Sequence, residues 1–534
     1  MAWLGFASLL LRCLEEQQGR GAAMEEAVWM WAVAACVKAL LIPSYRSTDF
    51  EVHRHWLALT SSVPLRRWYS DTSAPCCTLD YPPLFAYFQR LLALPATSLG
   101  LHPSGLLHLS PSPPSSAPLP VLLYLRLSVI VTDLVFLLAA VRLARRRLPI
   151  ARRSIVLVLL LWSPALLIVD HIHFQYNGYL LGILLLSLSF LEEGKDLAAG
   201  IAFSVLICSK HLFLIAAPLY FVYLLRHYCR GSLWKASGRF LIMGGVVGAV
   251  FVAAFGPFFY YGQIQQVLSR LFPFGRGLCH AYWAPNFWVF YIVIDKLLAV
   301  VLSKLGFDIP SPEASFTGGL VGNSSHFAVL PQVTPLITFV MVLLSMSPCL
   351  IKAFQKPQAK HLIRWVAYAF TCGFMFGWHV HEKASLHFTI PLAVISVDSL
   401  NDARHYFLLS IVSCYSMFPL LFEPQEYPIK VLLLTLYAIA MWIGFSSYFK
   451  LVVVPAEDKV HNPSTSDREE TFIGKFGTIY LLGLLGVELW GQLLHPYIFG
   501  SSLPFLPLMM ISIYCAIGMV CSWAWQLRQI LQRT

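Results

Sequence analysis

Apolar segments with the character of membrane helices recur along the whole chain, and they constrain its fold more than any other feature. They lie near residues 27–43, 121–141, 154–170, 177–191, 197–209, 212–226, 240–259, 286–303, 331–353, 364–378, 385–399, 405–422, 428–449, 474–494 and 505–525. Only helices and closed barrels satisfy every backbone hydrogen bond inside a bilayer, and a helix crosses it with about 20 apolar residues. The chain is therefore predicted to be an all-α polytopic membrane protein.

The charged residues support this class and indicate how the chain sits in the bilayer. Only 12% of the 534 residues are charged, about half of the usual share in a soluble protein. The net charge is +11, but no RNA- or DNA-binding signature accompanies it, so no nucleic-acid partner is expected. Lys and Arg concentrate in short loops at 142–153, 226–239 and 352–364, and again at 528–533. By the positive-inside rule these regions are predicted to be cytosolic.

The basic loops also limit the number of crossings. If every apolar segment spanned, residues 352–364 would lie on the opposite side from the other two basic loops. Leaving out the 286–303 segment, which Asp295 and Lys296 interrupt, restores a common side. About fourteen transmembrane helices with both termini cytosolic are then predicted. Because several segments are shorter than a full span, some helices are expected to be broken and buried in protein.

This topology places several polar stretches on the non-cytosolic face, namely 44–120, 170–176, 260–330, 378–384 and 423–427. In the first, 84–101 is expected to form an amphipathic interfacial helix and the Pro/Ser-rich 102–120 a flexible loop. Asn323 begins an N-S-S glycosylation sequon in the large loop 260–330. Residues 1–23 are interpreted as an N-terminal extension, and 24–534 as a single membrane domain.

The first large loop is the candidate catalytic surface. It begins S-T-D-F-E-V-H-R-H-W at residues 47–56 and continues to T-L-D-Y-P-P at 78–83. Asp49 and Glu51 thus lie among histidines and aromatic residues directly after the first apolar segment, and Asp80 follows later in the same loop. A carboxylate in this setting can act as a general base, and the residue pattern does not choose among the three.

Three further polar clusters fall on the same predicted face: D-H-I-H-F-Q-Y-N-G at 170–178, R-L-F-P-F-G-R-G-L-C-H-A-Y-W-A-P-N-F-W at 270–288, and G-W-H-V-H-E-K at 377–383. Ionisable residues at membrane depth indicate function, and arginine, lysine and histidine together can bind phosphate. The candidate substrate-binding residues are Glu51, Asp80, His171, His173, Gln175, Arg270, Arg276, His280, Trp283, His379, His381, Glu382 and Lys383.

Each cluster also has a structural interpretation. The histidines could end helices, and the arginines could snorkel to the membrane interface. Two H-x-H pairs have a spacing that metal ligands can share, but no H-E-x-x-H motif accompanies them, so no metal site is predicted.

Acids in one loop, phosphate-binding residues in others and apolar helices around them suit a lipid-linked phosphosugar donor. Its polyprenyl tail would lie among the helices, its phosphate would meet the basic residues, and one carboxylate would deprotonate an acceptor hydroxyl. Such a displacement needs one general base, not the paired carboxylates of a glycosidase. A lipid transporter or flippase, which also contains broken helices and buried charges, is the alternative from another class.

In this order, the stretches resemble the dolichyl-phosphate-glucose α-1,3-glucosyltransferases of the endoplasmic reticulum, from about residue 27 to the C-terminus. C-H-A-Y-W-A-P-N-F-W and G-W-H-V-H-E-K-A resemble the member that adds the second glucose, to Glc1Man9GlcNAc2-diphosphodolichol. The first-glucose enzyme, acting on Man9GlcNAc2-diphosphodolichol, and a mannosyltransferase of the same fold are the enzyme alternatives.

The resemblance implies a GT-C fold with lumenal amphipathic loop helices and an active site at the lumenal surface of the endoplasmic reticulum membrane. It implies dolichyl-phosphate-glucose as donor and a dolichyl-diphosphate-linked oligosaccharide as acceptor, without a metal or cofactor. It further implies that Asp49 is the general base of an inverting single displacement. Asp80 is expected to shape the same site, and His381 and the loop arginines to lie near the donor phosphate.

Overall fold

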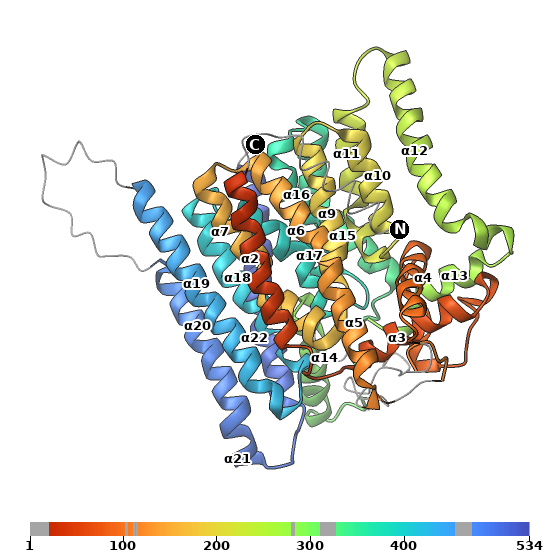
Figure 1. Cartoon of the computed structure of the whole chain (residues 1–534). Helices are drawn as coiled ribbons and strands as arrows, with labels where there is room; N and C mark the ends of the chain where they lie inside the picture. Colours follow the sequence, from red (N-terminus) through yellow and green to blue (C-terminus); the bar gives the residue numbers. More distant parts are fainter. Residues whose placement is uncertain are drawn as a thin grey trace, which may run out of the picture.

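The computed structural model of the chain (Figure 1) describes residues 21–101, 105–110, 113, 116–278, 284–309, 327–453 and 472–532. Within these ranges the chain is helical and contains no extended strand. His280, Trp283 and the sequon at Asn323 lie outside the described residues.

The α-helices are α2 (Gly21–Leu40), α3 (Thr48–Ser62), α4 (Pro83–Ser98), α5 (Leu119–Thr132), α6 (Leu134–Arg147), α7 (Ile150–Leu161), α8 (Pro164–Leu166), α9 (Asn177–Glu192), α10 (Asp196–Ile207), α11 (Ala217–His227), α12 (Leu233–Tyr260), α13 (Ile264–Leu271), α14 (Phe287–Lys304), α15 (Pro335–Gln355), α16 (Ala359–Phe376), α17 (Leu386–Ile395), α18 (Leu400–Tyr415), α19 (Tyr427–Val453), α20 (Gly474–Leu489), α21 (His495–Phe499) and α22 (Leu506–Gln532).

The lengths and composition of the helices confirm the predicted membrane class. In the described part of the chain, seven helical stretches are long and apolar enough to cross a membrane: Leu119–Arg147, Arg152–Phe174, Leu233–Tyr260, Pro335–Gln355, Pro424–Phe449, Gly474–Phe499 and Leu506–Gln532. Shorter apolar helices are Ala27–Leu40, Asn177–Glu192, Asp196–Ile207 and His211–His227. The count of about fourteen crossings stays a prediction.

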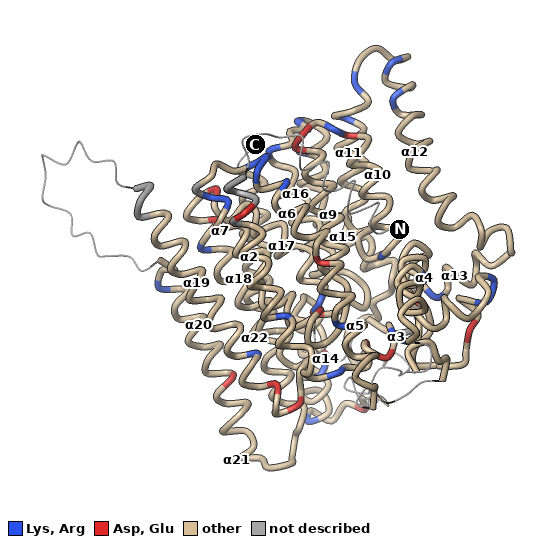
Figure 2. Tube along the Cα trace, in the orientation of Figure 1, with Lys and Arg blue, Asp and Glu red and all other residues tan. Residues whose placement is uncertain are grey.

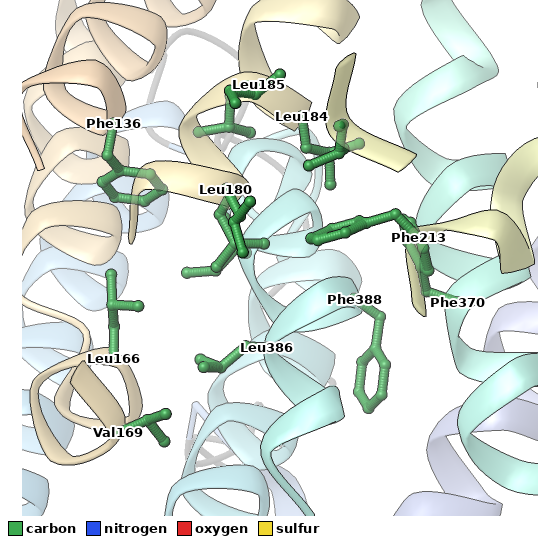
Figure 3. Close-up of a cluster of buried hydrophobic side chains, with 14 of the residues drawn as sticks. Phe136, Leu166, Val169, Leu180, Leu184, Leu185, Phe213, Phe370, Leu386 and Phe388 are labelled. Atoms are coloured by element: carbon green, nitrogen blue, oxygen red, sulfur yellow. The ribbon is translucent and has the colours of Figure 1, made fainter. Parts of the chain in front are cut away.

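The short helices form the centre of the molecule, as expected for broken helices buried in protein. α9 packs against both α6 and α10, and α16 packs along α17. α6 and α9 approach so closely that a Cβ on Gly182 would lie 2.7 Å from the backbone nitrogen of Phe136. Figure 3 shows the buried side chains where these helices meet, with Leu180 and Leu184 of α9 beside Phe213.

The predicted basic loops come together at one end of the bundle. Arg226 Nε donates to the carbonyl of Phe354 at 2.9 Å, and Arg147 Nη1 donates to the carbonyl of Lys360 at 3.3 Å. Figure 2 shows the Lys and Arg residues of these loops at the end of the molecule where the C-terminus lies. The common side that the positive-inside argument requires is therefore present in the structure.

Helix α9 connects this basic end to the opposite end of the molecule. Glu192, in its last turn, pairs with Arg147 at 2.6 Å, whereas its first residue, Asn177, belongs to the polar D-H-I-H-F-Q-Y-N-G stretch. A helix of 16 residues is about 24 Å long, so this stretch lies far from the basic loops.

The segment omitted from the predicted crossings forms α14, which is not among the candidate spans of the described chain. Its buried Asp295 accepts hydrogen bonds from the backbone nitrogens of Ala328, Val329 and Leu330 at 2.8–3.0 Å. These bonds satisfy the carboxylate and attach the loop that follows to the helix.

The prediction of a flexible 102–120 loop was wrong for residues 105–110. Leu106 is fully buried, and the guanidinium of Arg54 in α3 donates to the carbonyls of Gly105, Leu106, His108 and Ser110 at 2.6–3.3 Å. Charge-assisted bonds to four carbonyls fix this segment despite its composition.

Candidate active site

Asp49 lies in the first turn of α3, where its own sequence context positions it. Ser47 is the N-cap of this helix, and its hydroxyl accepts the backbone N–H of Asp49 at 3.1 Å. The same hydroxyl donates to the carbonyl of His173, so the cap also ties α3 to the D-H-I-H-F stretch. A carboxylate at a helix N-terminus is favoured by the helix dipole.

Three segments that are distant in sequence meet at one oxygen of this carboxylate. Asp49 Oδ2 accepts from Gln175 Nε2 at 2.7 Å and from Lys383 Nζ at 2.8 Å, and lies 3.3 Å from His173 Nδ1. The side chain of Asp49 is 25% exposed and that of Lys383 is 15% exposed. The structure thus brings four of the predicted site residues into one cluster.

The neighbouring charges keep Asp49 ionised. Burial raises its pKa, but Lys383 and His173 together lower it by their charges and hydrogen bonds, and the net pKa lies well below the usual range of a carboxyl. Asp49 is therefore a carboxylate at neutral pH, held in an ion pair with Lys383.

The backbone around this cluster departs from regular geometry in two places. Residues Leu167–Phe174 form a π-helix at the end of a candidate span, a form that is rare and often found at functional sites. Phe174 has φ 91° and His379 has φ 50°, in the left-handed region that bulky residues seldom adopt. Strained residues of this kind concentrate at functional sites, and these two lie next to His173 and four residues before Lys383.

Behind Gln175, the polar contacts continue to Asn177 and Asp170 of the same predicted stretch and to Lys210, which the sequence analysis did not single out. Asn177 Nδ2 donates to Gln175 Oε1 at 2.8 Å and to Asp170 Oδ1 at 2.9 Å, and Lys210 Nζ donates to Asn177 Oδ1 at 2.8 Å. Burial lowers the pKa of Lys210 to about 8. Lys210 falls between two apolar segments, and an ionisable residue in that position was a signal that could have identified it.

His171 belongs to a different, fully buried group. Its Nε2 lies 2.8 Å from Asp133 Oδ2, which also accepts from Lys38 at 2.6 Å. Among the residues that the structure describes, no three His, Cys, Asp or Glu side chains form a group that could hold a metal ion. His171 and His173 therefore do not point at one common site, because each contacts a different carboxylate.

Two predicted clusters meet through their backbones. His379 donates its N–H to the carbonyl of Leu278 at 2.8 Å, and its Nδ1 lies 3.1 Å from the carbonyl of Gly277. The ring of His381 lies 5.4 Å from that of His379. The loop that carries Arg276 thus runs beside the H-V-H-E-K stretch.

Arg270, Asp80 and Glu382 have surroundings of their own. Arg270 Nε donates to the carbonyl of Tyr69 at 3.3 Å, which attaches α13 to the loop after α3. Burial first, and then the charge of Asp80, raise the pKa of Tyr81 well above its usual range. Glu382 is 1% exposed, burial raises its pKa, and within the described chain its Oε2 has no hydrogen-bond partner.

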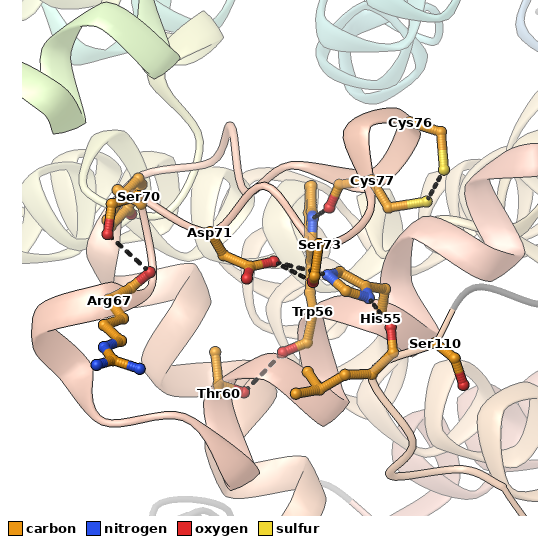
Figure 4. Close-up of polar contacts among 12 residues, drawn as sticks. His55, Trp56, Thr60, Arg67, Ser70, Asp71, Ser73, Cys76, Cys77 and Ser110 are labelled. Carbon is orange, nitrogen blue, oxygen red and sulfur yellow. Dashed lines mark hydrogen bonds and ion pairs between the residues drawn. The ribbon is translucent and has the colours of Figure 1, made fainter.

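Glu51 lies on another face of α3. Its oxygens pair with Arg54 Nη2 and Nε at 2.6 and 2.7 Å, and both side chains are buried. Figure 4 shows the adjacent contacts, in which His55 lies between Asp71 and a loop carbonyl, and Trp56 Nε1 donates to the carbonyl of Cys77. These contacts favour a structural role for Glu51, and its substrate-binding role stays a prediction.

Known proteins resemble the chain over nearly its whole length. The profile of the ALG6, ALG8 glycosyltransferase family matches residues 34–526. A protein of Arabidopsis thaliana named dolichyl pyrophosphate Glc1Man9GlcNAc2 alpha-1,3-glucosyltransferase is 60% identical, over 94% of this chain and 97% of its own. Proteins of the same name from Mus musculus and Schizosaccharomyces pombe are each 40% identical, over 94% and 91% of this chain and 96% and 94% of their own. The matched region includes every residue of the Asp49 cluster.

Proposed function

The chain belongs to the ALG6, ALG8 glycosyltransferase family, and we propose that it transfers glucose in α-1,3 linkage to Glc1Man9GlcNAc2 carried on dolichyl diphosphate. This adds the second glucose of the lipid-linked oligosaccharide. The observation that carries the proposal is the nearly full-length similarity to relatives named for this acceptor, 60% identical in one case. The donor in this proposal is dolichyl-phosphate-glucose, as the family resemblance implies.

Asp49 is the general base of the reaction. Its Oδ2 is occupied by Gln175 and Lys383, and the partial exposure of the side chain leaves Oδ1 for the acceptor hydroxyl. The acceptor oxygen attacks C1 of the donor glucose as its proton passes to Asp49, and the bond from C1 to the phosphate oxygen breaks. Dolichyl phosphate leaves as an anion, so one base suffices, and a β-linked donor gives an α-linked product by inversion.

Lys383 receives the donor phosphate in this scheme. An ammonium group beside the base, with part of its surface exposed, can pair with the phosphate as the donor enters. His379 and His381 lie in the same stretch, and Arg270, Arg276, His280 and Trp283 come from the loop joined to it. Asp80 and Glu382 are assigned to sugar hydroxyls.

The proposed location is the membrane of the endoplasmic reticulum, with the site on the lumenal face. The separation of the Asp49 cluster from the basic loops by the length of α9 supports this sidedness, because Lys- and Arg-rich loops stay in the cytosol. The lipid tails of donor and acceptor lie in the same membrane as the helices.

The test is transfer by the purified protein in lipid nanodiscs, with synthetic dolichyl-phosphate-glucose and either acceptor. We expect a one-hexose mass gain on Glc1Man9GlcNAc2 and none on Man9GlcNAc2. Transfer to Man9GlcNAc2 alone would identify the first-glucose enzyme instead. Transfer only from dolichyl-phosphate-mannose would identify a mannosyltransferase. Lipid translocation without any transfer would favour the flippase.

A further inference from the structure

A directed series of hydrogen bonds joins Asp49 to the buried amine of Lys210. Lys210 Nζ donates to Asn177 Oδ1 at 2.8 Å, Asn177 Nδ2 donates to Gln175 Oε1 at 2.8 Å, and Gln175 Nε2 donates to Asp49 Oδ2 at 2.7 Å. The two ends of the series come from the start of α3 and the residues after α10. Two amides lie between them.

The ends of the series determine its direction. An ammonium group can only donate hydrogen bonds and a carboxylate can only accept them, whereas an amide can do either through its two ends. With Lys210 at one end, the oxygen of Asn177 must face the lysine, so its nitrogen faces Gln175. The nitrogen of Gln175 then faces Asp49. Asp170, which accepts the second N–H of Asn177 at 2.9 Å, enforces the same orientation.

Burial makes the opposite orientation costly. Lys210 is 5% exposed and Asn177 is 3% exposed, so water does not replace a lost protein partner there. A buried donor or acceptor without a partner keeps its full desolvation penalty, and consecutive bonds in a low-dielectric interior strengthen one another. Space is also restricted, because a Cβ on the adjacent Gly178 would lie 2.0 Å from Asp133 Oδ1.

We propose that Lys210 is a positioning residue for Asp49. It fixes the direction of the Asn177 and Gln175 amides, so that Gln175 donates an N–H to Oδ2 of Asp49. The other carboxylate oxygen, Oδ1, is then held toward the hydroxyl of the acceptor sugar. This inference rests on the proposed role of Asp49 as the base. Lys210 itself touches neither substrate nor the reacting atoms in this scheme.

The charge of Lys210 makes the arrangement sensitive to pH. Burial lowers its pKa to about 8, so the ammonium is lost as the pH rises through that value. A neutral amine carries a lone pair and no longer forces the Asn177 oxygen to face it. The charged groups acting on Lys210 are Asp170, Lys383, Asp49 and Asp80. The titratable rings around it are those of His53, His387 and Tyr81, the last with its centroid 5.3 Å from Nζ. Turnover should therefore decline on the alkaline side, above pH ~8.

The experiment compares kcat and KM across pH for the full-length enzyme in nanodiscs, carrying Lys210→Met, Lys210→Arg or Asn177→Asp. We expect Lys210→Met to lower kcat by about tenfold to a hundredfold with little change in KM. Lys210→Arg keeps the charge, so it should retain more activity and lose the alkaline decline. Asn177→Asp is nearly isosteric but cannot donate to Gln175, and it should match Lys210→Met.

Lys195→Met is the matched control, because Lys195 is 59% exposed, pairs with Glu193 and lies at the basic end of α9. It should leave kcat, KM and the pH profile unchanged. Wild-type kcat and pH profile in Lys210→Met would overturn the proposal, and so would a rise in KM alone. If Lys210→Met does not fold, a wild-type kcat in Asn177→Asp would overturn it equally. Activity in Asp49→Asn would instead overturn the base assignment.

Discussion

Two carboxylates on different faces of α3 have very different surroundings. Asp49 and Glu51 lie two positions apart, which places them about 200° apart around the helix. Glu51 is 7% exposed and pairs with Arg54 of the same helix. Asp49 is 25% exposed, and its partners Gln175 and Lys383 come from sequence positions 126 and 334 residues away.

The difference indicates how a structural carboxylate differs in its surroundings from the carboxylate proposed to react. Glu51 is paired with Arg54 within α3, and Arg54 uses its remaining donors to hold the 105–110 loop. The charge of Asp49 is compensated by Lys383, whose partly exposed ammonium a phosphate can engage. If a phosphate binds Lys383, the ammonium is drawn from Asp49, which can then accept a proton more easily. The buried pair of Glu51 and Arg54 has no such competitor.

Asp49→Asn is expected to have the largest effect. It keeps the shape and removes the proposed base, so turnover should fall by at least about 10²–10⁴-fold while the protein folds normally. Transfer rates in nanodiscs and a thermal unfolding curve measure the two quantities. Glu51→Gln, the same change on the other face, should not reduce turnover per folded molecule. Near-normal turnover by a folded Asp49→Asn variant would show that Asp49 is not the base, and Glu51 would become the next candidate.

Lys383→Met should have the next largest effect, of about tenfold to a hundredfold in kcat/KM at neutral pH, because it removes the proposed phosphate partner. It also removes the main influence that lowers the pKa of Asp49, and burial then raises that pKa. The acidic limb of the pH–rate profile should accordingly move to higher pH. Lys360→Met, at the basic end of the molecule, is the control and should leave the limb in place. If the limb of Lys383→Met does not move either, Lys383 does not lower the pKa of the base.

Arg54→Met tests the structural face. Removing one partner of a buried ion pair costs about 3–5 kcal/mol, so this variant should unfold at lower temperature or denaturant concentration. Adding Glu51→Gln should recover part of the stability, since no unpaired charge then remains. Turnover per folded molecule should stay within about twofold of wild type. A large loss of turnover in the stable double variant would show that the Glu51–Arg54 pair is needed for turnover as well as for stability.

Asp71→Asn should have a small effect. It weakens the contact with His55, whose Nε2 lies 3.4 Å from a carboxylate that is 19% exposed. Partly exposed pairs are worth about 0–1 kcal/mol, so the unfolding midpoint should change only slightly and turnover should not change. A shift as large as that of Arg54→Met would show that this contact, not the Arg54 group, fixes the loop.

Chelation of divalent ions is expected to have no effect on transfer, because an ammonium group of the chain already stands where the phosphate is proposed to bind. Rates with and without EDTA measure this. Loss of activity with EDTA and recovery with a divalent ion would make an ion, not Lys383, the partner of the phosphate.

The family and the all-α GT-C membrane class predicted from the sequence are confirmed, and the sequence could support them because both depend on local patterns. Hydropathy reports membrane helices directly, and long motifs in a fixed order identify a family. Lys210 escaped prediction because a single lysine between two apolar segments is equally typical of a helix end. The packed 105–110 loop escaped it because Pro/Ser-rich composition reports chain stiffness and polarity, not the arginine that binds its carbonyls.

The sequence by itself determined which segments are apolar enough to enter the membrane, and that Asp49 follows the first of them within a polar stretch. Only the tertiary structure decided that Gln175 and Lys383 meet Asp49 and that Glu51 turns to Arg54. The reason is physical: contacts between residues 126 and 334 positions apart depend on how the buried helices pack. No local pattern encodes that packing, and it determines that Asp49 stays partly exposed while Glu51 is buried.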